Sequence, residues 1–500
     1  MTNLSDLFPA GAGKQVSFTA SGNVTSSGKP VVLNSDGTVT EVSGTASNVG
    51  SPQQYSPTTV YGGGAPQSSC YDTANDRVII AFKDANNSNA LTVIAGSLSG
   101  TTFTFGTAVA VATIANGNTF DVVFDTLRNC FVVVCQENSN LRCYTGTVAA
   151  VGSVITVNYS SALVVSSAAY DHVRAVFDST NNKTLLWGRD SSSKGQCFAI
   201  SVDAAYAPST SSAYNYSGGA NVDNAYIATS AVHDPDQGRV VMVYRGPSSV
   251  GYLNLIDCSG SNPTGITPLV NSSWSSSGYG GGSITYDTAN NKCVVFVYDA
   301  NNSNYLSYQV VTVTSGSTVT FGTKLTQSDA KTQYPDDQNS LYDSNSEQSV
   351  VTWNSNTTAN YAQGVTISGT TPVPSSSILE IVSASLIGKL PTLSLDSDTN
   401  QFIYAYYNYA STDEGYAKAF NLSSTNVTAS NFLGISDAAI SSAASGNITI
   451  KGGIAATGLS SLTPASDYYV QDDGTITTVS SDVKAGKALS ATAINLEYTS

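Results

Sequence analysis

The sequence predicts an all-β protein, a seven-bladed β-propeller inserted into a small β-domain made from both ends of the chain. Residues 71–111, YDTANDRVIIAFKDANNSNALTVIAGSLSGTTFTFGTAVAV, return at 286–326 as YDTANNKCVVFVYDANNSNYLSYQVVTVTSGSTVTFGTKLT. An aspartate before a polar turn and an apolar run recurs at intervals of 53, 53, 56, 53, 56 and 53 residues. These aspartates are Asp72, Asp125, Asp178, Asp234, Asp287, Asp343 and Asp396. Similar hairpin sequences also stand near the two chain ends.

Each repeat is predicted to form four strands. In the first repeat we expect them at 68–71, 77–83, 91–97 and 102–111, where β-branched and aromatic residues alternate with polar ones. The breaks DTAND, DANNSN and SLSGT are typical turn sequences. Four short strands per repeat of roughly 54 residues match the blades of a propeller, a fold with about 4–8 blades. An open β-solenoid is the competing all-β interpretation.

The propeller is expected at residues 46–431, and the two halves of the β-domain at 1–45 and 432–500. VVLNSDGTVTEVS (31–43) aligns without gaps on YYVQDDGTITTVS (468–480). The alignment places Asp36-Gly37 on Asp473-Gly474, and an Asp-Gly pair between alternating apolar residues favours a hairpin. Two separate small β-modules are the alternative.

Two further features concern closure of the ring and its central channel. Residues 46–60 are expected to supply a strand that closes the last repeat, so that no sheet edge stays open. The segments that lead into the first strand of each repeat differ most in sequence, and in a propeller they reach the rim of the channel. They are residues 61–69, 115–123, 167–176, 223–232, 279–285, 334–341 and 386–394.

Composition excludes several classes of function. Charged residues make up 11% of the 500 residues and the formal net charge is −15, so the basic surface that nucleic acids and anionic membranes require is missing. No stretch approaches the roughly 20 apolar residues of a membrane span, and residues 1–15 do not resemble a secretory signal. The seven cysteines are expected to be small buried side chains. A surface of extracellular type without an export signal suits a virion protein.

No catalytic, cofactor or metal site is predicted, and the ligand-binding residues stay unassigned. The repeat aspartates are expected to satisfy backbone N–H groups in turns. The stretch 396–400 resembles the front of a calcium loop, but Gln401 stands where that loop needs glycine. Neither histidine suggests a triad, and no catalytic carboxylate pair emerges. The residues considered for these roles are His172, His233, Glu137, Glu347, Glu380 and Glu414.

Tyrosines in polar stretches are candidates for a sugar-binding surface, because the ring covers a sugar face while amides and hydroxyls bond its edges. The alternative is that tyrosine is simply a good strand residue. These candidates are Tyr55, Tyr61, Tyr214, Tyr216, Tyr226, Tyr279 and Tyr334.

The C-terminal stretch resembles the end module of tail-fibre and other virion proteins of marine, cyanophage-like bacteriophages. The resemblance rests on Phe432-Leu433-Gly434-Ile435, Gly452-Gly453-Ile454, Tyr468-Tyr469-Val470-Gln471 with Asp473-Gly474-Thr475, and Ala485-Gly486-Lys487-Ala488-Leu489. VSFTASGNVTSSGKPVVLNSDGTV near the N-terminus resembles the opening of that module.

The resemblance implies a virion attachment element that carries a variable, outward-facing domain. We therefore expect a phage tail fibre or receptor-binding protein that binds a host glycan or protein without catalysis. It would be located in the virion, with other tail or capsid proteins as partners, no nucleic acid or membrane partner, and a possible homo-oligomeric state. A capsid decoration or collar protein and a polysaccharide depolymerase are the alternatives.

Overall fold

The structure is a computed structural model of the chain. It describes residues 14–45, 47–60, 67–114, 120–151, 154–222, 229–270, 279–314, 317–333, 336–355, 359–375, 377–383, 388–408, 413–422, 424–425, 427–481 and 483–497. Two compact units emerge: Met1–Asn48 with Leu422–Ser500, and Val49–Asn421. The described residues are in strands and turns apart from one 3-10 turn at Pro247–Ser249, and none of their helical segments could cross a membrane. The all-β prediction is confirmed.

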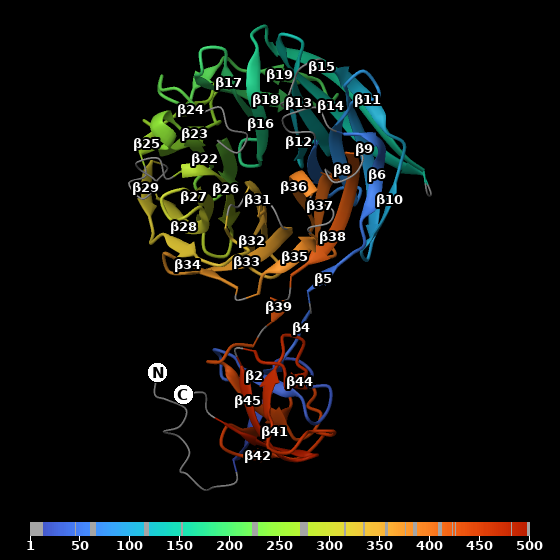
Figure 1. Ribbon diagram of the computed structural model, residues 1–500, viewed down its shortest axis with the longest axis vertical. Coiled ribbons are helices and arrows are strands. Elements are labelled where there is room, and N and C mark those ends of the chain that lie inside the picture. Colours follow the sequence, from blue (N-terminus) through green and yellow to red (C-terminus); the bar gives the residue numbers. More distant parts are fainter. Residues whose placement is uncertain are drawn as a thin grey trace. The chain divides into compact units, whose positions relative to one another are not determined.

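The larger unit contains seven antiparallel sheets among its described residues; six are built from consecutive strands, and the seventh is completed by strands from the start of the unit. In Figure 1 the first strands that carry a label lie toward the middle of a ring and the later strands lie outward. The first strands are β7 (Gln67–Asp72), β12 (Phe120–Asp125), β16 (Tyr170–Asp178), β21 (Thr229–Asp234), β26 (Tyr279–Asp287), β31 (Asp336–Asp343) and β36 (Gly388–Asp396).

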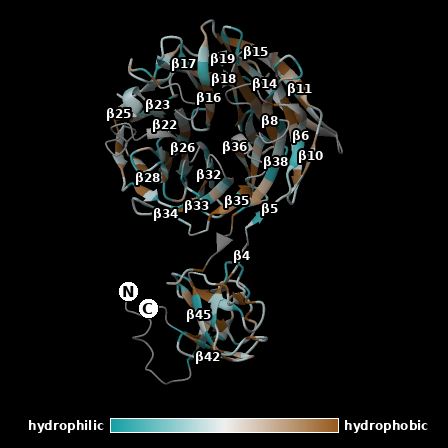
Figure 2. Cartoon of the chain, in the orientation of Figure 1, coloured by the Kyte–Doolittle hydropathy of each residue, from teal (hydrophilic) through white to brown (hydrophobic). Residues whose placement is uncertain are grey.

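The second and third strands of the sheets are the apolar ones. The second strands are β8 (Arg77–Asp84), β13 (Cys130–Glu137), β17 (Lys183–Asp190), β22 (Arg239–Arg245), β27 (Lys292–Asp299), β32 (Gln348–Asn354) and β37 (Gln401–Asn408). The third strands are β9 (Ala90–Ser99), β14 (Asn140–Val151), β18 (Gly195–Val202), β23 (Gly251–Asp257), β28 (Tyr305–Thr314), β33 (Asn360–Ser368) and β38 (Glu414–Asn421). Figure 2 shows hydrophobic residues along the strands and hydrophilic ones in many of the turns.

The outer strand is broken in most sheets, which differs from the prediction. In the first sheet β10 (Thr102–Phe105) pairs with the end of β9, while β11 (Val109–Thr113) pairs with its beginning. The break follows Phe105, whose ring lies over Gly96, where an added Cβ would come within 2.7 Å of that ring. Sequence alternation predicts one strand over 102–111 because it does not register this contact.

The outer strands of the other sheets repeat this arrangement, except in the second sheet, where one long outer strand pairs along the third strand from Leu141 to Val151. They are β15 (Val154–Ser166), β19 (Pro208–Thr210) with β20 (Tyr214–Asn215), β24 (Thr264–Gly265) with β25 (Leu269–Val270), β29 (Thr318–Phe321) with β30 (Leu325–Gln327), and β34 (Thr371–Pro374) with β35 (Leu379–Val382). In the last sheet β5 (Asn48–Val49) and β6 (Gln53–Thr59) take this place, with Thr59 opposite Glu414. Residues 53–59 thus supply the closing strand that the sequence predicts.

Apolar side chains fill the space between neighbouring sheets. Ile79 and Leu91 of the first sheet pack with Phe120 and Phe131 of the second. The first sheet also packs against the last, because Tyr71, Val78 and Phe82 share one buried cluster with Ile403 and Ala417. The row of sheets therefore returns on itself.

Among its described residues the smaller unit contains two five-stranded sheets. One has the order β1-β41-β40-β2-β3, and the other β42-β46-β45-β43-β44. The strands of the first are β1 (Gln15–Thr19), β2 (Pro30–Leu33), β3 (Val39–Glu41), β40 (Phe432–Ser436) and β41 (Ser445–Ile450). Those of the second are β42 (Ile454–Ala455), β43 (Asp467–Val470), β44 (Ile476–Thr477), β45 (Lys484–Ser490) and β46 (Ala493–Leu496). A further pair joins β4 (Gly44–Thr45) to β39 (Ser424–Thr425).

The two Asp-Gly hairpins of this unit have the same register. Val32 pairs with Thr40 in the first, and Tyr469 pairs with Thr477 in the second. In each turn the aspartate Oδ1 accepts a hydrogen bond from the backbone N–H of the threonine two residues on, at 2.9 Å. The hairpin prediction at Asp36-Gly37 and Asp473-Gly474 is confirmed.

Candidate functional site

The seven repeat aspartates lie in turns between the first and second strands, and each side chain is at most 2% exposed. Asp72 is representative, because its Oδ1 accepts the backbone N–H groups of Ala74 and Asn75 at 3.0 Å. Each of the other six accepts at least one N–H two or three residues on. The structural role predicted for these residues is confirmed, and Asp396 belongs to an ordinary turn of this kind.

Where the residue before the aspartate is polar, it contacts the neighbouring sheet, which the sequence did not reveal. Nε2 of His233 in the fourth sheet lies 3.0 Å from Oδ1 of Asp178 in the third. The Tyr286 hydroxyl contacts the Asp234 carboxylate in the same way. Burial favours a raised pKa of Asp178, but its hydrogen bonds with His233 and Asn181 outweigh burial and lower that pKa.

The same contact joins the first and last sheets. The Tyr71 hydroxyl donates to Asp76 of its own sheet and lies beside the Asp396 carboxylate of the last sheet. Burial, followed by the Asp76 hydrogen bond and the nearby charges, raises the pKa of the Tyr71 hydroxyl far above its usual value. The hydroxyl therefore stays protonated, beside carboxylates of two sheets far apart in sequence.

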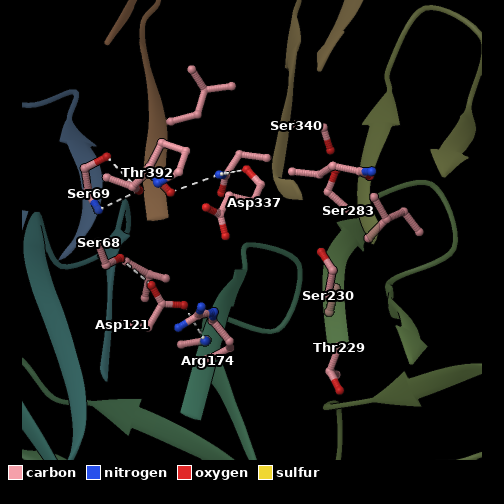
Figure 3. Close-up of a pocket in the computed structure, with 18 of the residues that line it drawn as sticks. Ser68, Ser69, Asp121, Arg174, Thr229, Ser230, Ser283, Asp337, Ser340 and Thr392 are labelled. Atoms are coloured by element: carbon pink, nitrogen blue, oxygen red, sulfur yellow. Dashed lines mark hydrogen bonds between the residues drawn. The ribbon is translucent and has the colours of Figure 1, made fainter. Parts of the chain in front are cut away.

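A polar cavity of about 250 Å³ lies between the first strands of all seven sheets (Figure 3). All seven segments predicted to reach the channel rim contribute to its wall, and Trp187 from the second strand β17 completes it. The wall residues are Gln67–Ser69, Asp121–Val123, Arg174–Ala175, Trp187, Thr229–Ala231, Gly282–Ile284, Asp337–Ser340 and Pro391–Leu393. Each group of the wall other than Trp187 falls within one of the variable segments.

Hydrogen bonds join the sheets along one side of the cavity. The backbone N–H of Ser69 donates to Oγ1 of Thr392 at 3.0 Å, which ties the first sheet to the last. Nδ2 of Asn339 donates to the carbonyl of Pro391 at 3.0 Å and ties the sixth sheet to the seventh. In Figure 3 the Ser69–Thr392 bonds lie on the same side as the bond from Ser68 to Asp121.

Asp121 is the centre of this bonded side. Its carboxylate accepts the Ser68 hydroxyl from the first sheet and, at 2.9 Å, the backbone N–H of Ala175 from the third. Its own neighbour Val122 donates a third hydrogen bond at 3.0 Å. Burial raises the pKa of Asp121, while the nearby Arg174 charge and these hydrogen bonds oppose the rise.

The opposite side of the cavity holds polar atoms with no partner among the described residues. They are the Trp187 indole N–H and the hydroxyls of Ser283 and Ser340. Trp187 is 2% exposed and Ser283 is 5% exposed. Because an unpaired buried donor costs free energy, these groups mark a place where a ligand could complete the hydrogen bonding.

The residues considered for catalysis do not meet at this cavity. His172, His233, Glu137, Glu347, Glu380 and Glu414 are absent from its described wall. Glu137 pairs with Arg142 at 2.6 Å, and Glu414 accepts the Tyr416 hydroxyl at 2.8 Å. No group of three His, Cys, Asp or Glu side chains among the described residues is placed to hold a metal ion.

The tyrosine candidates do not form a binding surface where the structure describes them. Tyr55 and Tyr216 are buried, and their rings cover Gly415 and Gly195. For these two the sugar-binding prediction is wrong, because the ring fills the space that a glycine leaves. Tyr214 is partly buried beside the same core. Tyr61, Tyr226 and Tyr334 lie outside the described residues, as does the side chain of Tyr279.

Six of the seven cysteines are buried and Cys70 is partly buried. All are free thiols in this structure, and burial raises the pKa of Cys130 to about 12. They are small core side chains, as the sequence predicts.

Comparison with known proteins finds β-propellers. No family model and no curated protein matches the chain. Sqt1 from Chaetomium thermophilum is 10% identical, with 71% of this chain and 85% of that chain covered and a TM-score of 0.42. The Cps50 (Swd1) β-propeller domain of Myceliophteria thermophila is 9% identical, with 74% and 100% covered and a TM-score of 0.46. The WD40 domain of SCAP from fission yeast is 9% identical, with 69% and 81% covered and a TM-score of 0.36.

The chain contains a β-propeller built from repeats, in agreement with the sheets described above. These similar structures are of fungal proteins. They contradict the prediction of a phage virion protein, whether a tail fibre, a decoration or collar protein or a depolymerase. They also contradict the predicted location in the virion. We correct both predictions to a β-propeller protein. The resemblance of residues 432–500 to a phage end module stays a prediction.

Proposed function

We propose that the chain is a non-catalytic binding protein that holds a small polar ligand in the channel of a seven-bladed propeller. In this proposal each of the seven sheets is one blade, and the propeller at 46–431 is inserted into a domain made of residues 1–45 and 432–500. Support for one closed ring comes from the buried cluster shared by the first and last sheets and from the Tyr71–Asp396 contact.

The observation that carries the proposal is the convergence of all seven first strands on one polar cavity. A channel filled only by packed side chains does not require a polar wall. Buried donors without partners, in contrast, are stabilised when a ligand supplies acceptors for them. A volume of about 250 Å³ suits a small metabolite better than a polymer segment.

The described wall also supports a role without catalysis. It contains no histidine, glutamate or cysteine, the side chains that most often transfer protons or attack substrates. Asp121 is engaged by three hydrogen bonds and is not poised as a base. The absence of a nucleic-acid or membrane partner and the homo-oligomeric state stay predictions.

Saturation-transfer NMR tests the proposal with the full chain and a panel of small polar metabolites. We expect transfer to at least one compound, which is recovered chemically unchanged after overnight incubation. Ser230→Trp, which fills the cavity, should abolish transfer, and Ser259→Trp in an exposed turn should not. Binding that survives Ser230→Trp in a folded protein, or turnover of the bound compound, would contradict the proposal.

A further inference from the structure

The cavity is asymmetric in its hydrogen bonding. From the sixth sheet through the seventh and first to the third, bonds run between sheets through Asn339, Thr392, Ser69, Ser68 and Asp121. On the other side, Trp187 of the third sheet, Ser283 of the fifth and Ser340 of the sixth carry buried polar atoms without a partner among the described residues. Figure 3 shows Ser230, Ser283 and Ser340 on this second side, without bonds to the other residues drawn. Hydrogen-bonding capacity is therefore left over on that side.

Arg174 supplies a positive charge where the two sides meet. It lies directly opposite Trp187 in the pairing of β16 with β17, so both side chains extend from the same face of the sheet. Nη1 makes only long contacts, of 3.4 Å, to the carbonyls of Phe120 and Val173. No ion pair of Arg174 is found within the part of the chain that the structure describes. The guanidinium thus has donors left for a ligand.

The unused hydrogen-bonding capacity on this side is rich in donors. The guanidinium and the indole N–H can only donate, and the hydroxyls of Ser283 and Ser340 can donate as well. A complementary ligand brings oxygen acceptors, and a planar carboxylate matches the fork of a guanidinium. Asp121 and Asp337 also line the cavity, so one cation faces two carboxyl groups. A second negative charge on the ligand is therefore unfavourable.

We propose that the channel binds a small monocarboxylate, with Arg174 as its counter-ion and the Trp187 N–H, Ser283 and Ser340 as further donors. This inference rests on the proposed function and names its ligand class. The Trp187 indole then lies in direct contact with the ligand, so binding changes its fluorescence. Trp353 is a built-in reference, because its indole N–H already donates to the carbonyl of Lys331 at 2.8 Å.

Fluorescence titration and calorimetry of the full chain with sodium acetate, at constant ionic strength, test the inference. For a four-atom ligand we expect saturable one-to-one binding with a Kd on the order of 1 mM. Arg174→Gln should weaken binding at least tenfold by calorimetry, since a charge-assisted hydrogen bond is lost. Arg77→Gln, which removes an arginine outside the cavity, should leave the Kd unchanged. Trp187→Phe should remove most of the fluorescence change while calorimetry still detects weakened binding.

The outcomes separate the ligand class from the site. Unchanged acetate affinity in Arg174→Gln, or no saturable binding up to about 100 mM, would overturn the carboxylate inference. If Arg174→Gln does not fold, Ser283→Ala decides, with an expected loss of threefold or more in affinity. Inorganic phosphate or ethylammonium binding more tightly than acetate, with loss in Ser230→Trp, would overturn the monocarboxylate but leave the binding cavity standing. No binding of any probe or panel compound would overturn both.

Discussion

Replacing Tyr286 by phenylalanine removes one hydroxyl that joins two sheets. That hydroxyl lies between the Asp234 carboxylate of the preceding sheet and Oδ1 of Asn291 in its own sheet, the latter at 3.4 Å. Oδ1 of Asp234 keeps a bond from the N–H of Gln237 at 3.1 Å. A hydrogen bond to a charged group contributes about 1.5–3 kcal/mol, and we expect a loss near the lower end because Asp234 is left partly satisfied. Phe124 and Phe177 occupy the same repeat position, so a ring without the hydroxyl fits.

Tyr71→Phe is the matched variant at the junction of the first and last sheets. If the ring is closed there as firmly as elsewhere, its effect should equal that of Tyr286→Phe within about 0.5 kcal/mol. Tyr159→Phe, at a tyrosine that is 49% exposed, is the control and should change stability by less than about 0.5 kcal/mol.

Urea unfolding followed by tryptophan fluorescence measures these effects. All three tryptophans, at positions 187, 274 and 353, belong to the larger unit, so the signal reports on the ring. A Tyr286→Phe protein as stable as the parent would refute the contribution of the hydroxyl. If Tyr286→Phe lowers the free energy of unfolding but Tyr71→Phe leaves it unchanged, closure between the first and last sheets would be refuted.

Two further predictions concern pH and backbone strain. Above about pH 4, the usual aspartate range, the lowered pKa of Asp178 contributes stability that is lost as the pH falls through that pKa. Asp178→Asn should therefore reduce the acid-side fall in melting temperature. Burial raises the pKa of Asp125, so its contribution to stability is present below about pH 4 and is lost as the pH rises through the folded pKa. Asp125→Asn should remove that loss. Thermal scans from pH 2.5 to 7 in which both variants change the pH dependence with the same sign would contradict the assignment. Gly37→Ala should lower stability by about 1 kcal/mol because Gly37 has a positive φ. Gly474→Ala should lower it by about 1–3 kcal/mol more, because a Cβ there would also lie 2.4 Å from the Val42 carbonyl oxygen. Equal losses, measured by hydrogen exchange of the two hairpins, would contradict this account.

The repeated turns could be predicted from the sequence because their chemistry is local. Asp72 and its counterparts bond N–H groups two or three residues on, so the spacing of polar and apolar residues predicts them. The equal register of the hairpins at Asp36-Gly37 and Asp473-Gly474 follows from a gapless alignment for the same reason.

The binding side of the cavity could not be predicted in that way. Its unpaired atoms come from Trp187, Ser283 and Ser340, which are up to 153 positions apart in the sequence and carry no shared motif. The bridge from Tyr71 to Asp396 likewise depends on ring closure. Arg174 stands within a variable segment that the sequence assigns to the channel rim, but nothing local distinguishes it from other arginines.

Hydrogen exchange of the full chain with and without saturating sodium acetate tests most directly whether the channel is the binding site. We predict slower exchange in peptides from the first strands β16, β26 and β31 and from β17, which carry the cavity side with unpaired donors. Peptides from the smaller unit should be unchanged. Protection confined to the outer strands or to the smaller unit would contradict a ligand in the channel.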